Sequence, residues 1–148
     1  MANTNAPFGL RPVRYMSGKV YTGAANIYKK EASVILGVGD PVVLAGSAEA
    51  VTGVPTITRA TAASGTITGV VVGFDPIRSD LNKNYMAAAD TGYVLVADDP
   101  DLVFEIQEDS VGGSIAVTSV SEFCDIATIG NASTTTGLST VLLDSSDA

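Results

Sequence analysis

Histidine and tryptophan are absent from the 148 residues of this sequence, and cysteine occurs once, as Cys124. A single cysteine excludes an intrachain disulfide framework. A catalytic thiol needs a neighbouring base, and without histidine we interpret Cys124, which follows Phe123, as a small buried hydrophobic residue. The sequence also lacks a nucleophile-elbow motif, a phosphate-binding glycine loop and a cysteine pair. We therefore expect a protein that is not an enzyme and that holds no cofactor and no metal.

Charged side chains are scarce, at 16% of residues, and the net charge is −8. Their distribution is uneven, because residues 1–30 hold five bases and no acid, whereas residues 90–148 hold eleven acids and no base. The net charge argues against nucleic acid as a partner. The separation of signs predicts contact between the basic head and the acidic body, within one subunit or between subunits.

Long apolar runs are missing as well. No run approaches the roughly 20 residues that cross a bilayer, and the N-terminal residues lack the apolar core of a signal peptide. We expect a soluble protein with no membrane partner, made in a reducing cytoplasm. A chain of this length forms one domain whose core needs no cross-links.

Short apolar stretches separated by turn residues predict an all-β fold, an antiparallel β-sandwich or barrel of about eight short strands with at most one short helix. Residues 62–65 and 98–101 are interpreted as hairpin loops that join the strands on either side of them. Residues 27–34 are also compatible with a short helix, and residues 77–91 are the one segment compatible with a longer helix. The expected strands are residues 27–34, 41–46, 56–60, 66–74, 93–97, 102–107, 114–120 and 138–143.

The first 25 residues show no convincing periodicity, yet Phe8, Leu10, Val13 and Tyr15 make them too apolar for an inert tail. We interpret residues 1–25 as an extended N-terminal arm that precedes a single β domain at residues 26–148. The arm either reaches a neighbouring molecule, which we favour, or packs on its own domain as an edge strand.

The stretch VLVADDPDLVFEIQED, residues 94–109, concentrates acidic residues. Strand periodicity directs Leu102, Phe104 and Ile106 to the core, and Val94 and Val96 to the core from the preceding strand. The acids between the two strands are then expected at a corner, where Asp side chains accept hydrogen bonds from nearby backbone N–H groups. Two further Asp-Pro pairs, at residues 40–41 and 75–76, are expected to serve corners in the same way.

Two chemical roles for these acids compete with the structural one. The three carboxylates of DDPD could bind calcium, but the ligand spacing of an EF-hand loop is absent, so a solvated turn is favoured. Paired carboxylates such as Asp99 and Glu105 could act as acid and base. The other residues of a catalytic site are missing, which favours the structural interpretation.

Three segments in chain order resemble a known family. The opening NAPFGLRPVRYMSGKVYTGAANIYK, the segments GDPVVL and GVVVGF, and the pair VLVADDPDLVFEIQED are similar to head decoration, or capsid cement, proteins of tailed bacteriophages. The resemblance covers most of the chain, and its most specific parts are APFGLRPV and DDP-x-x-x-FE-x-Q. Neither is a catalytic motif, so the resemblance implies a structural role and a mode of assembly.

The resemblance implies a compact β domain on the outer surface of a virion shell, made in the bacterial host cytoplasm. Its implied partners are a major capsid protein of the HK97 type and other copies of itself, as a homotrimer or dimer. Phe104–Gln107 would form part of the fold. A head–tail connector or tail-tube protein, and a non-catalytic β binding module, are the alternatives. The implied contacts to the capsid or to another subunit come from the arm: Phe8, Leu10, Arg11, Pro12, Arg14 and Tyr15.

Overall fold

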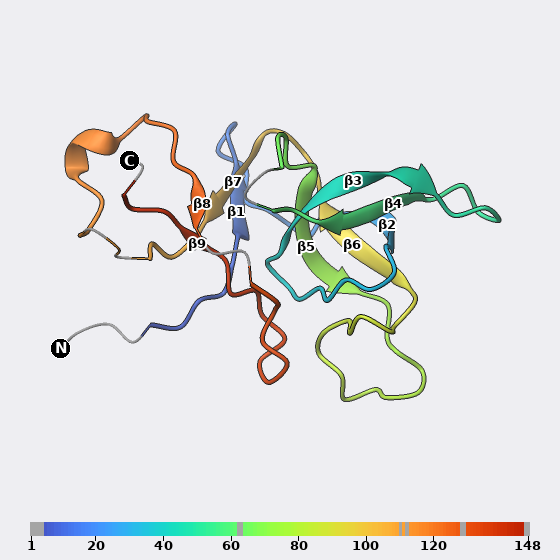
Figure 1. Cartoon of the computed structure of the whole chain (residues 1–148). Helices are drawn as coiled ribbons and strands as arrows, with labels where there is room; N and C mark the ends of the chain where they lie inside the picture. Colours follow the sequence, from blue (N-terminus) through green and yellow to red (C-terminus); the bar gives the residue numbers. More distant parts are fainter. Residues whose placement is uncertain (1–4, 62–63, 110, 112, 128–129, 147–148) are drawn as a thin grey trace.

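The computed structural model describes residues 5–61, 64–109, 111, 113–127 and 130–146. It confirms the all-β prediction, because these residues form nine strands and one short 3-10 helix, and none of them is in an α-helix (Figure 1). None of these residues therefore belongs to a helix that could span a membrane. The strands are β1 Arg11–Tyr15, β2 Asn26–Lys30, β3 Pro41–Ala48, β4 Pro55–Arg59, β5 Gly69–Phe74, β6 Tyr93–Ala97, β7 Leu102–Glu105, β8 Ile126–Ala127 and β9 Leu142–Leu143, and the 3-10 helix η1 is Val117–Ser119.

Five strands form a closed barrel in the order β2-β4-β3-β5-β6, on the right of Figure 1. Every neighbouring pair is antiparallel except β2 and β4, which are parallel. In β6 the predicted alternation is confirmed, since Val94 and Val96 are fully buried and Leu95 between them is 36% exposed. The other buried side chains of the barrel core are Leu36, Val42, Ile57, Val71 and Met86.

Two predicted hairpins are wrong. The strands on either side of residues 62–65 do not pair, because β3 lies between β4 and β5 in the barrel. The chain also leaves the barrel after β6, so that β7 pairs with β1 and not with β6. A turn signal reports a local change of direction, whereas the choice of partner depends on strands that are distant in sequence. Residues 62–63 lie outside the described residues.

A second, smaller sheet layer is built along residues 102–109. At one end β7 pairs antiparallel with β1, with Tyr15 opposite Leu102 and Arg11 opposite Glu105. At the other end Glu108 forms a parallel bridge with Leu143, which belongs to β9, and β9 pairs with β8. Residues 102–109 thus contact an N-terminal segment through β7 and a C-terminal segment just after it (Figure 1). The prediction that Phe104–Gln107 forms part of the fold agrees with this position, since Leu143 N–H donates to the Gln107 carbonyl at 2.9 Å.

Four further local predictions need correction. Residues 77–91 form no helix, because Met86 makes a backbone bridge with Leu36 and the Asp90 carboxylate accepts the Ala87 N–H at 2.6 Å, which closes a turn. Residues 114–120 contain η1 instead of a strand. The last strand is limited to β9, and Leu138 instead bridges Val38. Cys124 is half-buried, not buried.

Candidate interaction surface

The N-terminal segment lies along its own chain. Besides the pairing of β1 with β7, the Gln107 amide donates to the Asn5 side-chain oxygen at 2.8 Å, and Arg11 forms a salt bridge with Glu105. The structure therefore shows Arg11–Tyr15 as a strand paired within its own chain, as in the edge-strand alternative. The predicted contact between basic head and acidic body is present within the subunit, in the Arg11–Glu105 pair. Contact with a neighbouring molecule stays a prediction.

Three segments that are distant in sequence meet at residues 9–10, 38–39 and 139. The Leu10 N–H donates to the Gly39 carbonyl at 3.0 Å, and the Ser139 N–H donates to the Val38 carbonyl at 2.8 Å. Gly9 has φ +71°, and a Cβ there would lie 2.4 Å from the Gly39 oxygen and 2.4 Å from the Ser139 Cβ. Only glycine satisfies both the left-handed backbone and this close approach. The segments APFGLRPV and GDPVVL therefore contact each other directly, and both are part of the fold.

Asp40 is buried next to this junction. Its side chain is fully inaccessible, and one carboxylate oxygen accepts the Gly37 N–H at 2.8 Å. Burial raises the pKa of Asp40, and the Ser139 hydroxyl, the Gly37 N–H and Arg59 offset that rise only in part. The prediction that Asp serves the corners is confirmed here, and again where Asp99 accepts the Asp101 N–H at 2.9 Å. Asp40 thus stabilises the turn between Gly37 and β3.

Four of the six predicted contact residues line a groove between the N-terminal segment and the barrel. They are Phe8, Leu10, Arg11 and Pro12, and the groove has a volume of about 340 Å³. The Arg11 guanidinium lies 5.1 Å from the centre of the Phe8 ring. Leu10 also lines a second groove of about 280 Å³, on the side of β6 and β7. Phe8, Leu10 and Pro12 are half-buried there, whereas Arg11 is exposed. The first groove is completed by Tyr21, Val38, Val71, Val72 and Leu138.

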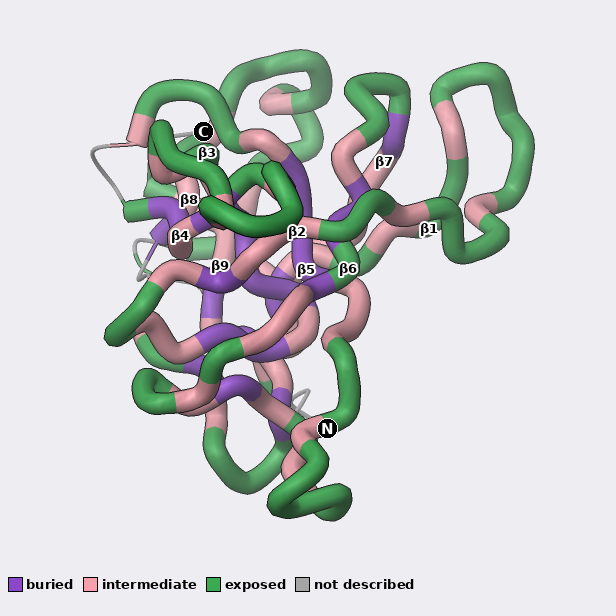
Figure 2. Tube along the Cα trace, turned by 90° about the vertical axis from the view of Figure 1, so that its right-hand side faces the viewer, coloured by how far each residue is buried: buried purple, intermediate pink, exposed green. Residues whose placement is uncertain are grey.

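The other two predicted residues lie in a small hairpin, residues 13–21, that reaches out from the body and is mostly exposed (Figure 2). Tyr15 N–H donates to the Lys19 carbonyl at 2.8 Å, and the Tyr15 and Tyr21 rings lie 6.4 Å apart on one face. On the opposite face Arg14 stands across from Val20. Facing residues of an antiparallel pair share a side of the sheet, and so do residues two apart. Arg14, Met16 and Val20 therefore form what we call the outer face of the hairpin.

An apolar surface in the C-terminal half was not predicted. Val117 is 88% exposed, Val120 is 75% exposed and Phe123 is fully exposed. We call these three residues the η1 surface. The prediction of a strand at residues 114–120 did not indicate this surface, because an alternating strand would bury one face, whereas Val117 and Val120 are both exposed. Large exposed apolar groups that lie together mark interaction sites.

In the acidic stretch at residues 94–109, the Asp98 carboxylate accepts hydrogen bonds from other side chains of the protein. Asp98 accepts hydrogen bonds from the Tyr28 hydroxyl at 2.6 Å and from the Asn26 amide at 3.0 and 3.1 Å. The hydrogen bond to Asp98, followed by burial, raises the pKa of Tyr28 to about 12. Within the described part of the chain, no group of three or more carboxylate or cysteine residues is placed to hold a metal ion.

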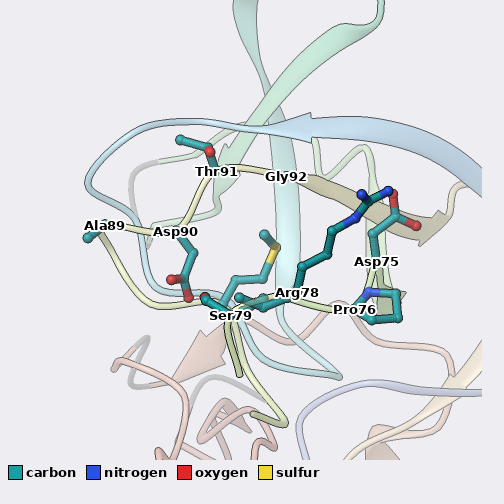
Figure 3. Close-up of a pocket in the computed structure, with 10 residues that line it drawn as sticks. Asp75, Pro76, Arg78, Ser79, Ala89, Asp90, Thr91 and Gly92 are labelled. Carbon is teal, nitrogen blue, oxygen red and sulfur yellow. The ribbon is translucent and has the colours of Figure 1, made fainter. Parts of the chain in front are cut away.

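A further pocket of about 530 Å³ lies beneath the loop that follows β5 (Figure 3). Asp75 and Arg78 lie at one end of it and Asp90 at the other. Burial raises the pKa of Asp90, but the hydrogen bonds from Lys83 and from the Ala87 N–H outweigh it and leave the pKa lowered. Lys83 approaches the Asp90 carboxylate to 2.7 Å. A carboxylate held in this way is a poor general base, so the pocket offers no evident catalytic pair.

Comparisons with protein-family models, with curated proteins and with solved structures found no match for this chain. A function for this chain is therefore inferred from its fold, its surfaces and the resemblance of its sequence segments.

Proposed function

We propose that this protein is a structural virion protein that binds the outer surface of a bacteriophage shell and stabilises it as a capsid decoration protein. The observation that carries the proposal is the spatial arrangement of the segments that resemble this family. APFGLRPV includes the first three residues of β1, DDP-x-x-x-FE-x-Q contains β7, and these two strands pair. GDPVVL packs on Gly9 through Gly39. Segments that are separate in sequence thus form one structural unit.

The surface supports a binding role better than a catalytic one. The outer face of the hairpin and the η1 surface expose large apolar side chains, with Met16 at 71% and Phe123 at 100%. The pocket beneath the β5 loop holds a carboxylate that is already paired with Lys83. A decoration protein needs surfaces of this kind, since it bridges capsomers through contacts and performs no reaction.

Binding to a shell has a favourable energetic basis in this case. A specific contact typically covers about 800 Å² on each partner. Many copies on a symmetric shell, each contacting two capsomers, add avidity, so that each single contact can be weak. The proposed partner is a major capsid protein of the HK97 type, and the proposed location is the outside of the capsid.

Reconstitution tests this proposal. Purified protein is mixed with expanded, undecorated shells of the phage that encodes it, and bound copies per shell are counted after sedimentation. We expect saturation at hundreds of copies and a higher melting temperature of the shell. Saturation at a few dozen copies or fewer would favour a head–tail connector or tail component. The absence of binding would favour a non-catalytic β binding module. A heat-unfolded sample of the same protein serves as the control for nonspecific adsorption.

A further inference from the structure

Asp40 holds an ionisable group in a place that water does not reach. Its side chain is fully buried at the end of the turn formed by residues 37–40. One carboxyl oxygen, Oδ2, accepts the Gly37 N–H at 2.8 Å, whereas no described residue donates a hydrogen bond to the other oxygen, Oδ1. The Ser139 hydroxyl lowers the pKa of Asp40 without forming a hydrogen bond of ordinary geometry to Oδ1. A buried carboxylate with an unpartnered oxygen costs free energy, and protonation removes that cost.

The charge of an ionised Asp40 is compensated only in part by its surroundings. Arg59, at the end of β4, is the charged side chain that acts on it, but the two are not among the ion pairs of the described residues. The Arg59 Nη1 donates to the Asn131 side-chain oxygen at 2.8 Å instead. The other segments around the turn, which are β3, β5, residues 5–10 and residues 130–143, contain no ionisable side chain.

The turn that contains Asp40 is held by three neighbours to different extents. β5 and the C-terminal segment each make two backbone hydrogen bonds with residues 37–40. The N-terminal segment makes one, from the Leu10 N–H to the Gly39 carbonyl at 3.0 Å. Residues 8–10 are therefore the neighbour that separates from the turn at the lowest cost. The bonds of the other two neighbours are Gly39 N–H to Val71, Val71 N–H to Asp40, Val38 N–H to Gly137 and Ser139 N–H to Val38.

Residues 8–10 also lie against the two residues next to the Asp40 carboxyl. A Cβ on Gly9 would lie 2.4 Å from the Ser139 Cβ, and a Cβ on Gly39 would lie 2.3 Å from the Phe8 carbonyl oxygen. The N-terminal segment is thus in close contact with the residue whose hydroxyl acts on Asp40 and with the residue that precedes Asp40. Separation of residues 8–10 from this place would open a path for water to the carboxyl.

We propose that protonation of Asp40 controls whether residues 8–10 stay docked on residues 37–40. With the neutral acid, the docked arrangement excludes water at no electrostatic cost. When Asp40 loses its proton, the carboxylate gains hydration if residues 8–10 separate. Phe8 and Leu10, which line the groove of about 340 Å³, would then be free to contact another molecule. The proposal concerns this chain alone and needs no shell, so its test is separate from the test of capsid decoration.

Hydrogen exchange of the Leu10 amide, followed by NMR, is the main test. Because this amide donates to Gly39, its protection relative to an unstructured peptide at the same pH measures docking. Burial raises the pKa of Asp40 in the docked form above its ordinary value of 3.8, so docking is fully stable below that pH and is weakened as the pH rises through the raised pKa. We expect Leu10 protection to fall from about pH 5 upwards, by at most about tenfold per pH unit, the limit for one proton. The amides of Ser139 and Lys30, bonded to Val38 and Gly92, should stay protected.

Asp40→Asn removes the proton equilibrium and keeps an oxygen that can accept the Gly37 N–H. Leu10 protection in this variant should not depend on pH. Asp90→Asn is the matched control, because Asp90 also accepts the N–H three residues earlier and the net charge changes by the same one unit. Asp90 is paired with Lys83 and has a lowered pKa, so this variant should keep the pH dependence of the wild type.

Arg59→Met is a second test that leaves Asp40 in place. Loss of the cation raises the pKa of the docked Asp40 further, so the fall in Leu10 protection should continue to a higher pH than in the wild type. Arg78→Met removes an exposed base from the loop after β5 and should show the wild-type profile.

Four results would overturn the proposal. One is Leu10 protection that stays level in the wild type between about pH 5 and pH 8. Another is a fall that persists in Asp40→Asn. An equal fall at the Ser139 and Lys30 amides would show that the whole chain unfolds and that residues 8–10 do not separate alone. An unshifted profile in Arg59→Met would assign the proton to a different group.

Discussion

Replacing Gly9 by alanine tests whether the start of the chain is part of the fold. Gly9 has φ +71°, which costs an alanine roughly 1–2 kcal/mol. The added Cβ would also lie 2.4 Å from the Gly39 oxygen, a backbone atom that moves only if the junction with Gly39 and Ser139 moves. Such overpacking adds about 1–3 kcal/mol. We therefore expect Gly9→Ala to lower the free energy of unfolding by about 2–5 kcal/mol in total.

Gly18→Ala is the matched control. Gly18 has φ +86°, but a Cβ there meets nothing within 4 Å. This variant therefore bears only the backbone cost of about 1–2 kcal/mol. The difference between the two variants, about 1–3 kcal/mol, isolates the packing of Gly9 against Gly39.

The assay is equilibrium unfolding in urea, followed by circular dichroism. All variants are fitted with one common m-value, the slope of the free energy of unfolding against urea concentration. If both glycine variants lose the same stability within error, residues 5–10 do not pack in the junction. The N-terminal segment would then be an independent arm, and the pairing of β1 with β7 would not contribute to the fold in solution.

Three other predictions concern ionisable groups. Hydrogen bonds from Thr52 and Tyr93, together with the salt bridge to Lys29, lower the pKa of Glu49 from 4.5 to about 2. This contribution to stability is present above pH 4.5 and is lost as the pH falls towards 2, so the melting temperature of Glu49→Gln should decline less over that range than that of the wild type. The pKa of Tyr28 is raised to about 12, so its contribution is present below pH 10 and is lost as the pH rises towards 12. In Tyr28→Phe, the last phenolate to appear in an absorbance titration should be missing. The buried Lys30 ammonium donates to the carbonyls of Glu31, Val34 and Ala88, and Lys30→Met should lose about 1–3 kcal/mol in urea unfolding.

Each of these predictions has a result that contradicts it. Parallel acid profiles of Glu49→Gln and wild type would show that the contacts of Glu49 do not form. A late-ionising tyrosine that persists in Tyr28→Phe would assign the raised pKa to a different phenol. Lys19→Met, at an exposed position, should leave the free energy of unfolding unchanged. An equal loss of stability in both lysine variants would show that the buried contacts of Lys30 do not stabilise the fold.

The parts of the fold that sequence predicted are those that depend on neighbouring residues. The alternation of Val94, Leu95 and Val96 reports one strand with one buried face. The role of Asp99 at its corner needs only the backbone two residues further on. Both features can be read from a few consecutive positions, and the structure confirms both.

The parts that sequence did not predict depend on distant partners. Nothing near β7 indicates that it pairs with β1, some ninety residues earlier, because the pairing depends on the path of the whole chain between the two strands. The contact of Gly9 with Gly39 becomes visible only in three dimensions. Among the predicted contact residues, Arg14 is placed on an exposed face, whereas Leu10 turns towards the barrel. The η1 surface was missed, because residues 114–120 were predicted as a strand with one buried face, whereas Val117 and Val120 are both exposed.

The most direct test of the proposed role is the number of copies of this protein in purified virions, measured by quantitative mass spectrometry relative to the major capsid protein. Capsid decoration predicts hundreds of copies per particle, in a simple ratio to the major capsid protein. Absence from the particle, or a few dozen copies, would contradict it.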